Sequence, residues 1–473
     1  MSYRELSIEE YQAASGVELG RLVAEGSVSP VHLTELALSI ASYWESTINA
    51  YVGFREEAAL AEAAALEAEA RAGRLRSPLH GVPIASKDNM YIVGEPCLKG
   101  SRTSTAEPAL TASPFVERLV AAGTVIIGRT TTPEFGWKGT GISPLTGVTR
   151  NPWDPTRGSG GSSAGSGATV GSGAVPIATG SDAGGSVRIP AAFCGVVGLK
   201  PTLSAIPVWP GTVNESLSHA GPLTRRVEDA LAVLRIARGP DPRDPQSAYA
   251  IPSPLPHPAR PRVGIVRAPF GIAPDPEVAE RLEPALAAIA AADIADIDEV
   301  DLGLPAPREI FEALWVTGRG LGFSELIARQ GAIMDQGLAR LKGLAEAYTL
   351  PDFLAALTAR RAFNAAMYDW LARYDLLVMP TEPLTAFEAD QEVPAGGEAD
   401  AKLPWITWTP YTYPFNITGQ PAVTIPVDLA EGRLPVGLQI VGGWARDELV
   451  LEFAAAAEAL LSATNALRVA PPR

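Results

Sequence analysis

The chain has 473 residues, of which 47% are hydrophobic and 19% are charged. This composition is typical of a globular protein with a sizeable core and excludes an intrinsically disordered chain. The formal net charge of −15 argues against a nucleic-acid partner and against an anionic membrane surface, because both favour basic proteins.

The two cysteines, Cys97 and Cys194, do not have a spacing typical of a metal site or a disulfide framework. We therefore expect no metal and no cofactor. The first residues include no apolar leader segment, and no apolar run approaches the length that spans a membrane. These features predict a cytoplasmic protein without a membrane partner.

No low-complexity linker divides the chain, so we expect a single domain over residues 1–473. Its expected parts are an N-terminal helical segment at about residues 1–75, a glycine-rich core at about 76–230, a variable helical region at about 300–375, and C-terminal strands and a helix at about 376–465.

The N-terminal segment contains several helix-start signals. Ser29 precedes a proline that suits the first helical position, and residues 56–72 are rich in alanine and glutamate before a glycine. Two serine–glutamate pairs have the spacing of a capping box, namely Ser7 with Glu10 and Ser15 with Glu18. We expect these helices to cover the core and to carry no chemistry.

Short apolar runs and helical patterns alternate after residue 80. Residues 81–85 and 124–128 are predicted as strands, and residues 113–122 between them as a helix, which is the rhythm of an α/β sheet with helices on both faces. Residues 135–153 are rich in glycine, proline and aromatic residues and predict a long ordered loop that forms a pocket wall.

The C-terminal half continues this pattern. An aromatic cluster at residues 405–413 is predicted to cover a pocket, and residues 383–403 to form a loop. Strands are predicted at residues 263–266, 376–379, 422–427 and 436–441, with the last two paired, and helices at 277–292, over most of 305–373, and at 447–461.

The strongest functional signal is the glycine- and serine-rich stretch at residues 157–202. Apolar runs in its second half predict a buried core segment and not a flexible linker. Two clusters stand out, GGSS at residues 160–163 and DAGGSVR at 182–188. In the second, Ser186 follows glycines whose N–H groups are unshielded by side chains, a pattern typical of a backbone oxyanion hole beside a nucleophile.

A serine nucleophile needs a base. None of the four histidines has a recognisable triad context; they are His32, His80, His219 and His257. Lys87, by contrast, follows a short apolar run at a predicted strand end, where burial disfavours the ammonium form. The sequence therefore predicts that Lys87 is neutral near pH 7 and accepts the proton of a serine.

Lys87, Ser162 and Ser186, with the two serines 24 positions apart, resemble the amidase signature family of serine hydrolases. The resemblance extends from about residue 20 almost to the C-terminus. Its further motifs are GRTTTPEFG at 128–136, GVVGLKPT at 195–202, SHAGPLTR at 218–225 and NITGQPA at 416–422. It implies an α/β fold with a large central twisted mixed β-sheet covered by helices on both faces.

The resemblance also implies roles for these three residues. Ser186 would be the nucleophile, although a serine in a turn after two glycines is common in proteins. Ser162 would lie in a cis peptide and pass protons between Ser186 and the general base Lys87. Ser163 is the alternative relay. Either serine could also be the N-cap of the following helix, and this role does not exclude a role in proton transfer. The chain departs from the family pattern at Ala164 and Ala183. Both positions are expected to act through their backbone groups, so these side chains do not weaken the expected activity.

Four backbone N–H groups are the candidate oxyanion donors, those of Ala183, Gly184, Gly185 and Ser186. An ion pair of Lys87 with Asp88 or Asp182 would keep the amine protonated, so the mechanism requires both carboxylates to be engaged elsewhere. We expect Asp182 to hold backbone donors of the glycine-rich turn.

Substrate contacts are predicted less directly. The candidates are Trp137, Arg188, Trp408 and Tyr411. Packing is the favoured interpretation for Trp137, and a structural ion pair is equally open for Arg188. His219 is expected to be a loop or capping residue. The aromatic residues favour an uncharged aryl or alkyl acyl group over an anionic one.

The sequence thus predicts an amidase that hydrolyses a small or aryl/alkyl carboxylic amide to an acid and an amine or ammonia, through an acyl-enzyme on Ser186. The alternatives are the A-type subunit of a tRNA-dependent amidotransferase, which needs partner chains and a route for ammonia, and an esterase of the same family. A non-catalytic scaffold is disfavoured by the intact Lys87, Ser162 and Ser186. We expect a small-molecule amide as partner, and a homodimer.

Overall fold

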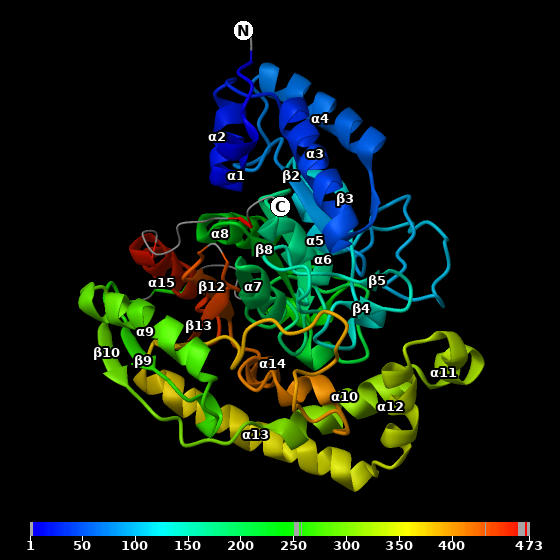
Figure 1. The fold of residues 1–473 in the computed structure, drawn as a ribbon, viewed down its shortest axis with the longest axis vertical. Helices are drawn as coiled ribbons and strands as arrows, with labels where there is room; N and C mark the ends of the chain where they lie inside the picture. Colours follow the sequence, from blue (N-terminus) through cyan, green and yellow to red (C-terminus); the bar gives the residue numbers. More distant parts are fainter. Residues whose placement is uncertain (1–2, 250–254, 257, 431, 462–468, 471–473) are drawn as a thin grey trace.

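The computed structural model describes residues 3–249, 255–256, 258–430, 432–461 and 469–470. Its centre is a mixed sheet that has eleven strands within these residues (Figure 1). In order across the sheet they are β1 (Tyr51–Phe54), β3 (Val125–Thr130), β2 (Pro83–Lys87), β6 (Ile177–Asp182), β8 (His219–Thr224), β7 (Val197–Lys200), β12 (Ala422–Val427), β13 (Val436–Gly442), β11 (Leu376–Pro380), β9 (Arg262–Ile265) and β10 (Asp296–Glu299).

Strand β2 lies between two parallel neighbours, β3 and β6. Because both of its edges are paired and helices cover the sheet, all five of its residues are buried. The predicted strand 81–85 is shifted by two residues, since Gly81 has a φ of +79° and the strand begins only at Pro83. The shift makes Lys87 the last residue of the strand.

The sheet is antiparallel over its middle strands, from β6 through β8, β7, β12 and β13 to β11. The predicted pairing of the two C-terminal strands is confirmed, with Val423 opposite Ile440. Parallel pairing returns at the far edge, where β9 pairs with β11 and β10. The combination gives the mixed sheet that the resemblance implied.

The N-terminal helices gather at one end of the molecule (Figure 1). They are α1 (Ile8–Ala13), α2 (Gly16–Ala24), α3 (Pro30–Ile48) and α4 (Glu56–Arg71). Ser7 forms the predicted capping box, Ser15 accepts a hydrogen bond from the N–H of Glu18, and Ser29 caps α3. Strand β1 interrupts this segment and pairs with β3, which the helical prediction for residues 1–75 missed.

Helices pack on both faces of the sheet (Figure 1). Those in contact with it include α6 (Ala164–Gly171), α7 (Arg188–Cys194), α8 (Val227–Ala237), α9 (Pro276–Ala291) and α15 (Asp447–Leu460), and α5 (Pro114–Ala121) packs on α8. Helices α6 and α7 begin within the glycine-rich stretch, and all of their residues are buried. The prediction that this stretch belongs to the core is therefore confirmed.

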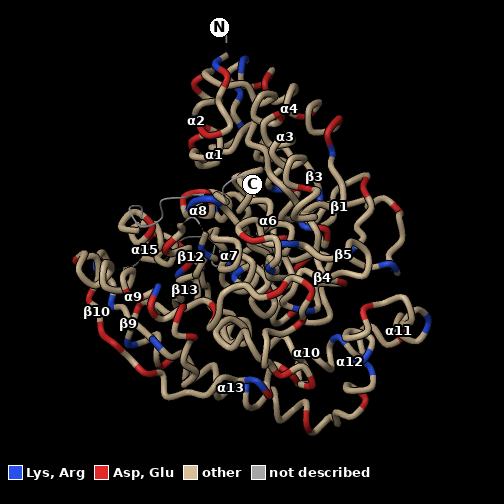
Figure 2. The backbone as a smooth tube through the Cα atoms, in the orientation of Figure 1, with Lys and Arg blue, Asp and Glu red and all other residues tan. Residues whose placement is uncertain are grey.

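The variable region forms a helical layer along one side of the molecule (Figure 1). It contains α10 (Arg308–Gly322), α11 (Ser324–Gln330), α12 (Gln336–Glu346) and α13 (Leu350–Arg373), with α14 (Pro414–Thr418) packed on α13. An aromatic core cluster separate from the main one lies under this layer and includes Trp315, Trp405 and Tyr411. Figure 2 shows acidic and basic residues distributed over outer elements such as α4 and β10.

The connections also follow the predictions. Loop 135–153 is ordered and contains a small hairpin of β4 (Ile142–Ser143) and β5 (Gly147–Val148), while residues 383–403 contain no helix or strand. Short 3-10 turns are η1 (Glu134–Gly136), η2 (Glu215–Leu217), η3 (Pro245–Tyr249), η4 (Pro269–Gly271), η5 (Gly331–Ile333) and η6 (Pro404–Thr407). None of the helices built from described residues is both long and apolar enough to cross a lipid bilayer.

Candidate active site

The amine of Lys87 lies among three hydroxyl groups. Its Nζ lies within hydrogen-bond distance of Ser162 Oγ, at 2.8 Å, and of the Oγ atoms of Ser163 and Ser181, at 3.0 Å each. The side chain is fully buried, and this burial lowers the pKa of Lys87 well below the ordinary value for lysine. Lys87 thus has the environment that the sequence predicted, a desolvated amine beside serines.

Both neighbouring carboxylates are bound by arginines instead of Lys87. Asp88 lies 2.6 Å from a guanidinium nitrogen of Arg129, and Asp182 lies 2.9 Å from Nε of Arg188. Burial alone would raise the pKa of Asp182, but the Arg188 charge holds it well below its usual value. The requirement that these carboxylates be engaged elsewhere is met.

Asp182 also organises the glycine-rich turn that follows it. Its Oδ1 accepts from the N–H of Gly185 at 2.8 Å and its Oδ2 from the N–H of Val187 at 3.2 Å. This confirms the predicted role of Asp182. It also means that the N–H of Gly185 is occupied, whereas those of Ala183, Gly184 and Ser186 have no acceptor among the described residues.

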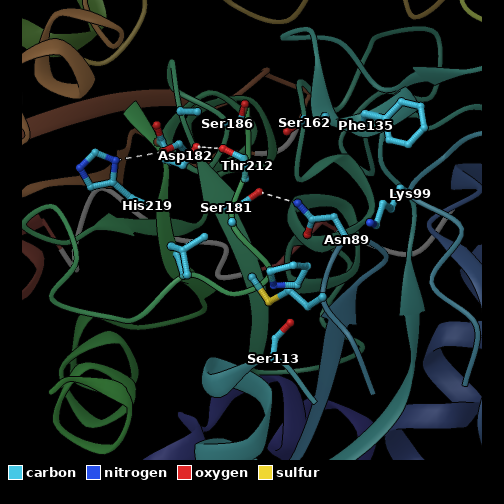
Figure 3. Close-up of a pocket in the computed structure, with 18 of the residues that line it drawn as sticks. Asn89, Lys99, Ser113, Phe135, Ser162, Ser181, Asp182, Ser186, Thr212 and His219 are labelled. Carbon is cyan, nitrogen blue, oxygen red and sulfur yellow. Dashed lines mark hydrogen bonds between the residues drawn. The ribbon is translucent and has the colours of Figure 1, made fainter. Parts of the chain in front are cut away.

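The two serine clusters are held side by side. The N–H of Ser163 donates to the carbonyl oxygen of Ser186 at 3.1 Å, and the peptide between Gly161 and Ser162 is cis. The side chains of Ser162 and Ser186 face the same cavity (Figure 3). No described side chain forms a hydrogen bond with Ser186 Oγ, so this hydroxyl is open to the cavity.

The cavity has a volume of about 230 Å³ and is lined by both polar and apolar residues. Ser181, Asp182 and Ala183 line it together with the two serines. Much of the remaining wall is apolar and includes Met90, Phe115, Phe135, Pro207, Val208, Trp209, Val213 and Phe323. A site of this kind suits a small ligand with an apolar body and one reactive polar group.

Three of the predicted substrate contacts are core residues. Trp137, Trp408 and Tyr411 are at most 4% exposed, belong to the aromatic cluster, and are absent from the cavity wall. The indole of Trp408 donates to the carbonyl of Glu392, and the Tyr411 hydroxyl donates to the carbonyl of Ile272. Packing is therefore the observed role of these side chains.

Arg188 forms the structural ion pair that the sequence left open. Its guanidinium is fully buried and does not line the cavity. Besides Asp182, it donates to the carbonyl of Thr412 and to the side chains of Asn416 and Gln439. With these partners Arg188 ties α7 to the C-terminal part of the chain and leaves no donor for a substrate.

His219 differs from its prediction as a loop or capping residue. It is the first residue of β8, is 1% exposed and lies opposite Asp182 in the sheet (Figure 3). Its Nδ1 is 2.9 Å from the carbonyl oxygen of Leu217, which can only accept, so Nδ1 carries the proton. Burial lowers the pKa of His219 well below the ordinary value for histidine. The imidazole is thus a neutral part of the cavity wall.

Ser181, Asn89 and Arg319 line the cavity but were missed by the sequence reasoning. Ser181 Oγ accepts from both Lys87 and Asn89, at 3.0 and 2.8 Å (Figure 3). The parallel pairing of β2 with β6 brings the carboxyl ends of these strands together, so the polar residues ending β6 were a usable signal. Arg319 lies in α10, where no motif marks it.

No group of acidic, histidine or cysteine side chains within the described residues could hold a metal ion. The site itself contains a buried amine, a chain of hydroxyls, and backbone N–H groups without an acceptor among the described residues, all beside a small cavity. These are the parts needed for nucleophilic attack on a carbonyl carbon.

The sequence of this chain is similar to those of known amidases and amidotransferase subunits. The family model described as Amidase matches residues 32–451. The chain is 35% identical over 460 residues to an acylamidase of Rhodococcus erythropolis, covering 94% of this chain and 95% of the relative. It is also 35% identical over 481 residues to the A-type subunit of the glutamyl-tRNA(Gln) amidotransferase of Symbiobacterium thermophilum, covering 93% and 95%.

A solved structure of a bacterial aryl acylamidase of the amidase signature family superposes with a TM-score of 0.86 at 26% identity, covering 97% of this chain and 99% of that one. The chain therefore belongs to the amidase signature family. It is an enzyme of the hydrolase type that acts on amide C–N bonds.

Proposed function

We propose that this protein hydrolyses a carboxylic amide to an acid and an amine or ammonia, through an acyl-enzyme on Ser186. One observation carries the proposal. The fully buried amine of Lys87 has no carboxylate partner among the described residues and lies 2.8 Å from Ser162, which lines the same cavity as Ser186. A neutral lysine connected to a serine pair supplies the base that histidine supplies in other serine hydrolases.

In the first step, Ser186 Oγ attacks the amide carbonyl carbon. The Ser186 proton passes to Ser162 while Ser162 gives its own proton to Lys87, so one proton moves in total. The negative charge that develops on the carbonyl oxygen is met by backbone N–H groups without other acceptors among the described residues, those of Ala183, Gly184 and Ser186.

In the second step, the tetrahedral intermediate loses its amine. The C–N bond breaks, and the proton held by Lys87 returns through Ser162 to the leaving nitrogen. Water then attacks the ester formed on Ser186, with the same residues removing its proton and returning one to Ser186 Oγ. The acid leaves, and the enzyme regains its starting protonation state.

Ser162 is the favoured relay. Lys87 contacts the hydroxyls of both Ser162 and Ser163, but only Ser162 lines the cavity. Ser163 Oγ donates to the carbonyl oxygen of Ser181 and accepts from the N–H of Ser181, each at 3.3 Å. These two bonds suit a role in holding the backbone at the end of β6.

The amidotransferase component is the second candidate, favoured by the identity to the A-type chain of Symbiobacterium thermophilum. Its amide donor, glutamine, carries an ammonium group that needs an acidic partner. Asp182 is the one acidic residue among the described cavity lining, and Arg188 already pairs with it. The apolar walls and the absence of a free carboxylate among those lining residues favour an aryl or alkyl amide without an ammonium group.

The test is hydrolysis of an anilide panel by the wild type and by Ser186→Ala, with fluorophosphonate labelling located by mass spectrometry. We expect the label on Ser186 and no turnover by the variant. Ser216→Ala is the control, because Ser216 is exposed and lies outside this cavity. Turnover retained by Ser186→Ala would contradict the proposal, and ammonia release from glutamine only in a complex would support the second candidate.

A further inference from the structure

The cavity contains more positive than negative charge. Of its described lining residues, three are formally charged, namely Lys99, Asp182 and Arg319. Asp182 is already paired with Arg188, whereas no carboxylate of the described residues pairs with Lys99 or Arg319. The cavity of an acidic protein with a net charge of −15 therefore keeps two cations without a counter-charge among the described residues.

Arg319 is the more notable of the two because it is buried. It is 6% exposed, and its Nη1 donates to the carbonyl oxygen of Phe135 at 2.9 Å. The guanidinium lies over the rings of Trp315 and Phe323, 4.7 and 5.8 Å from their centroids. These contacts fix the plane of the guanidinium and leave Nε buried without an acceptor among the described residues.

A purely structural role explains only part of this arrangement. The bond to Phe135, whose ring stacks on Phe323 at 4.8 Å, ties α10 to the cavity wall. One carbonyl, however, uses one of the five N–H groups of an arginine, and a buried charge without a partner is unfavourable. A planar cation with free donors in a cavity is typical of a site that receives a carboxylate.

Building on the proposed function, we propose that the substrate is an amide that also carries a carboxylate, and that Arg319 binds this carboxylate and so determines specificity. Lys99, whose Nζ contacts the Tyr91 hydroxyl at 3.2 Å, adds attraction for an anion at the same cavity. The apolar walls contact the carbon skeleton between the amide and the carboxylate.

This substrate class replaces the uncharged acyl group that the sequence favoured. That preference came from Trp137 and from the aromatic cluster at 405–413, but Trp137, Trp408 and Tyr411 are packed in the core and do not line the cavity. Arg319, which does line it, lies in a helix without any motif. The charge of the cavity is therefore a better guide to the substrate than the aromatic composition of the chain.

The test uses two matched pairs of substrates. In the first pair the carboxylate is on the acyl side, with succinic mono-para-nitroanilide compared with isohexanoyl para-nitroanilide. In the second it is on the amine side, with para-acetamidobenzoate compared with para-isopropylacetanilide. Each neutral member replaces the carboxylate by an isopropyl group of similar shape. The measured quantity is the ratio of kcat/KM within a pair, at the pH plateau of each enzyme.

Four proteins are compared: the wild type, Arg319→Gln, Arg319→Lys and Arg308→Gln. Arg308 is the matched control, because it lies at the start of the same helix and outside the cavity, so the same charge is lost elsewhere. We expect the wild type to prefer the anionic member of at least one pair by about 10- to 100-fold, mainly through KM. Arg319→Gln should abolish this preference, Arg319→Lys should keep part of it, and Arg308→Gln should leave it unchanged.

The inference is overturned if the wild type shows no anionic preference in either pair, or if the preference survives in Arg319→Gln. If Arg319→Gln fails to fold, the wild-type ratios of kcat/KM within the two pairs still test the inference. Hydrolysis of a neutral member together with labelling of Ser186, but without anionic preference, would overturn this inference and leave the proposed function intact. An unlabelled Ser186 and no hydrolysis of any member would overturn the proposed function itself.

Discussion

Arg188 and Asp182 form a fully buried ion pair, with Nε of the arginine 2.9 Å from Oδ2 of the carboxylate. The pair joins the end of β6 to the start of α7 and encloses the turn that contains Ser186. Asp182 is near enough to favour the charged form of Lys87, and its pairing with Arg188 limits this effect. The ion pair thus serves both the shape of the turn and the protonation state of the amine.

Loss of Arg188 should therefore change both stability and pH dependence. Arg188→Met leaves the Asp182 carboxylate buried without its counter-charge, which we expect to lower the free energy of unfolding by about 3–5 kcal/mol. The unpaired carboxylate should raise the pKa of Lys87, so the acid limb of kcat/KM should move to higher pH. Urea unfolding and a pH–rate profile measure the two effects.

Two further variants control this prediction. Arg267→Gln removes an exposed arginine that pairs with Glu283 and Glu299, and should cost about 0–1 kcal/mol with no change in the pH profile. Asp182→Asn removes the negative charge and should move the acid limb in the opposite direction, to lower pH. Equal pH profiles for all of these proteins would refute the link between Asp182 and Lys87.

The two serines that contact Lys87 should differ in their effect on rate. Ser162→Ala should lower kcat by about 10²- to 10⁴-fold, because the proton path between Ser186 and Lys87 is removed. Ser163→Ala removes a hydroxyl outside the cavity and should lower kcat by no more than about tenfold. Single-turnover acylation rates distinguish them, and a larger loss for Ser163→Ala would make Ser163 the relay.

The candidate site could be predicted from the sequence because its parts have local signals. Lys87 follows an apolar run, and Ser162 and Ser186 stand beside glycines, so burial and backbone geometry are visible in the pattern itself. The parallel pairing of β2 and β6 then determines that Lys87 and Ser181 meet. The fold class was predictable for the same reason, since short apolar strands alternate with amphipathic helices.

The cavity wall could not be predicted in this way. Aromatic residues fill cores as readily as binding sites, so composition did not distinguish Trp408 in the core from Trp209 in the wall. Arg319 stands on α10 among apolar residues, and its position at the cavity depends on how α10 packs against the loop at residue 135. Such long-range packing leaves no trace in local spacing.

The burial of Lys87 has a consequence for the pH dependence of stability. In the folded protein its pKa is lowered, so between this pKa and about 10.4 the unfolded chain binds more protons than the folded one. The free energy of unfolding should therefore rise with pH in that window. Above the unfolded pKa the amine is neutral in both states, so its burial no longer destabilises the folded protein through proton binding. Lys87→Met should remove up to about 1.4 kcal/mol per pH unit from this slope.

Urea unfolding of the wild type and Lys87→Met at several pH values measures the difference between the slopes. Lys87→Met also loses the hydrogen bonds between the amine and Ser162, Ser163 and Ser181, which affects stability at every pH, and comparing slopes removes this constant loss. The matched control is Lys342→Met, an amine on the outer helix α12 that pairs with Glu346. If Lys87→Met and the wild type have the same slope, the amine is not titrating with a lowered pKa.

The turn before Ser186 should not tolerate a side chain at Gly185. This residue has a φ of +123°, and a Cβ built on it would lie 2.4 Å from Thr412 Oγ1. Gly185→Ala must therefore shift the turn, displacing the N–H groups of Gly184 and Ser186 that are proposed to bind the oxyanion. A displacement of about 1 Å at such a site can lower kcat by roughly 10²-fold.

Gly396→Ala provides the comparison that separates backbone strain from contact. Gly396 also has a positive φ, of +78°, but a Cβ there would meet nothing within 4 Å. We expect this variant to lose about 1–2 kcal/mol of unfolding free energy and no activity. Gly185→Ala should lose more stability and also the rate of Ser186 acylation, measured with a fluorophosphonate. Normal acylation in a folded Gly185→Ala would mean that the turn adapts and that the oxyanion donors lie elsewhere.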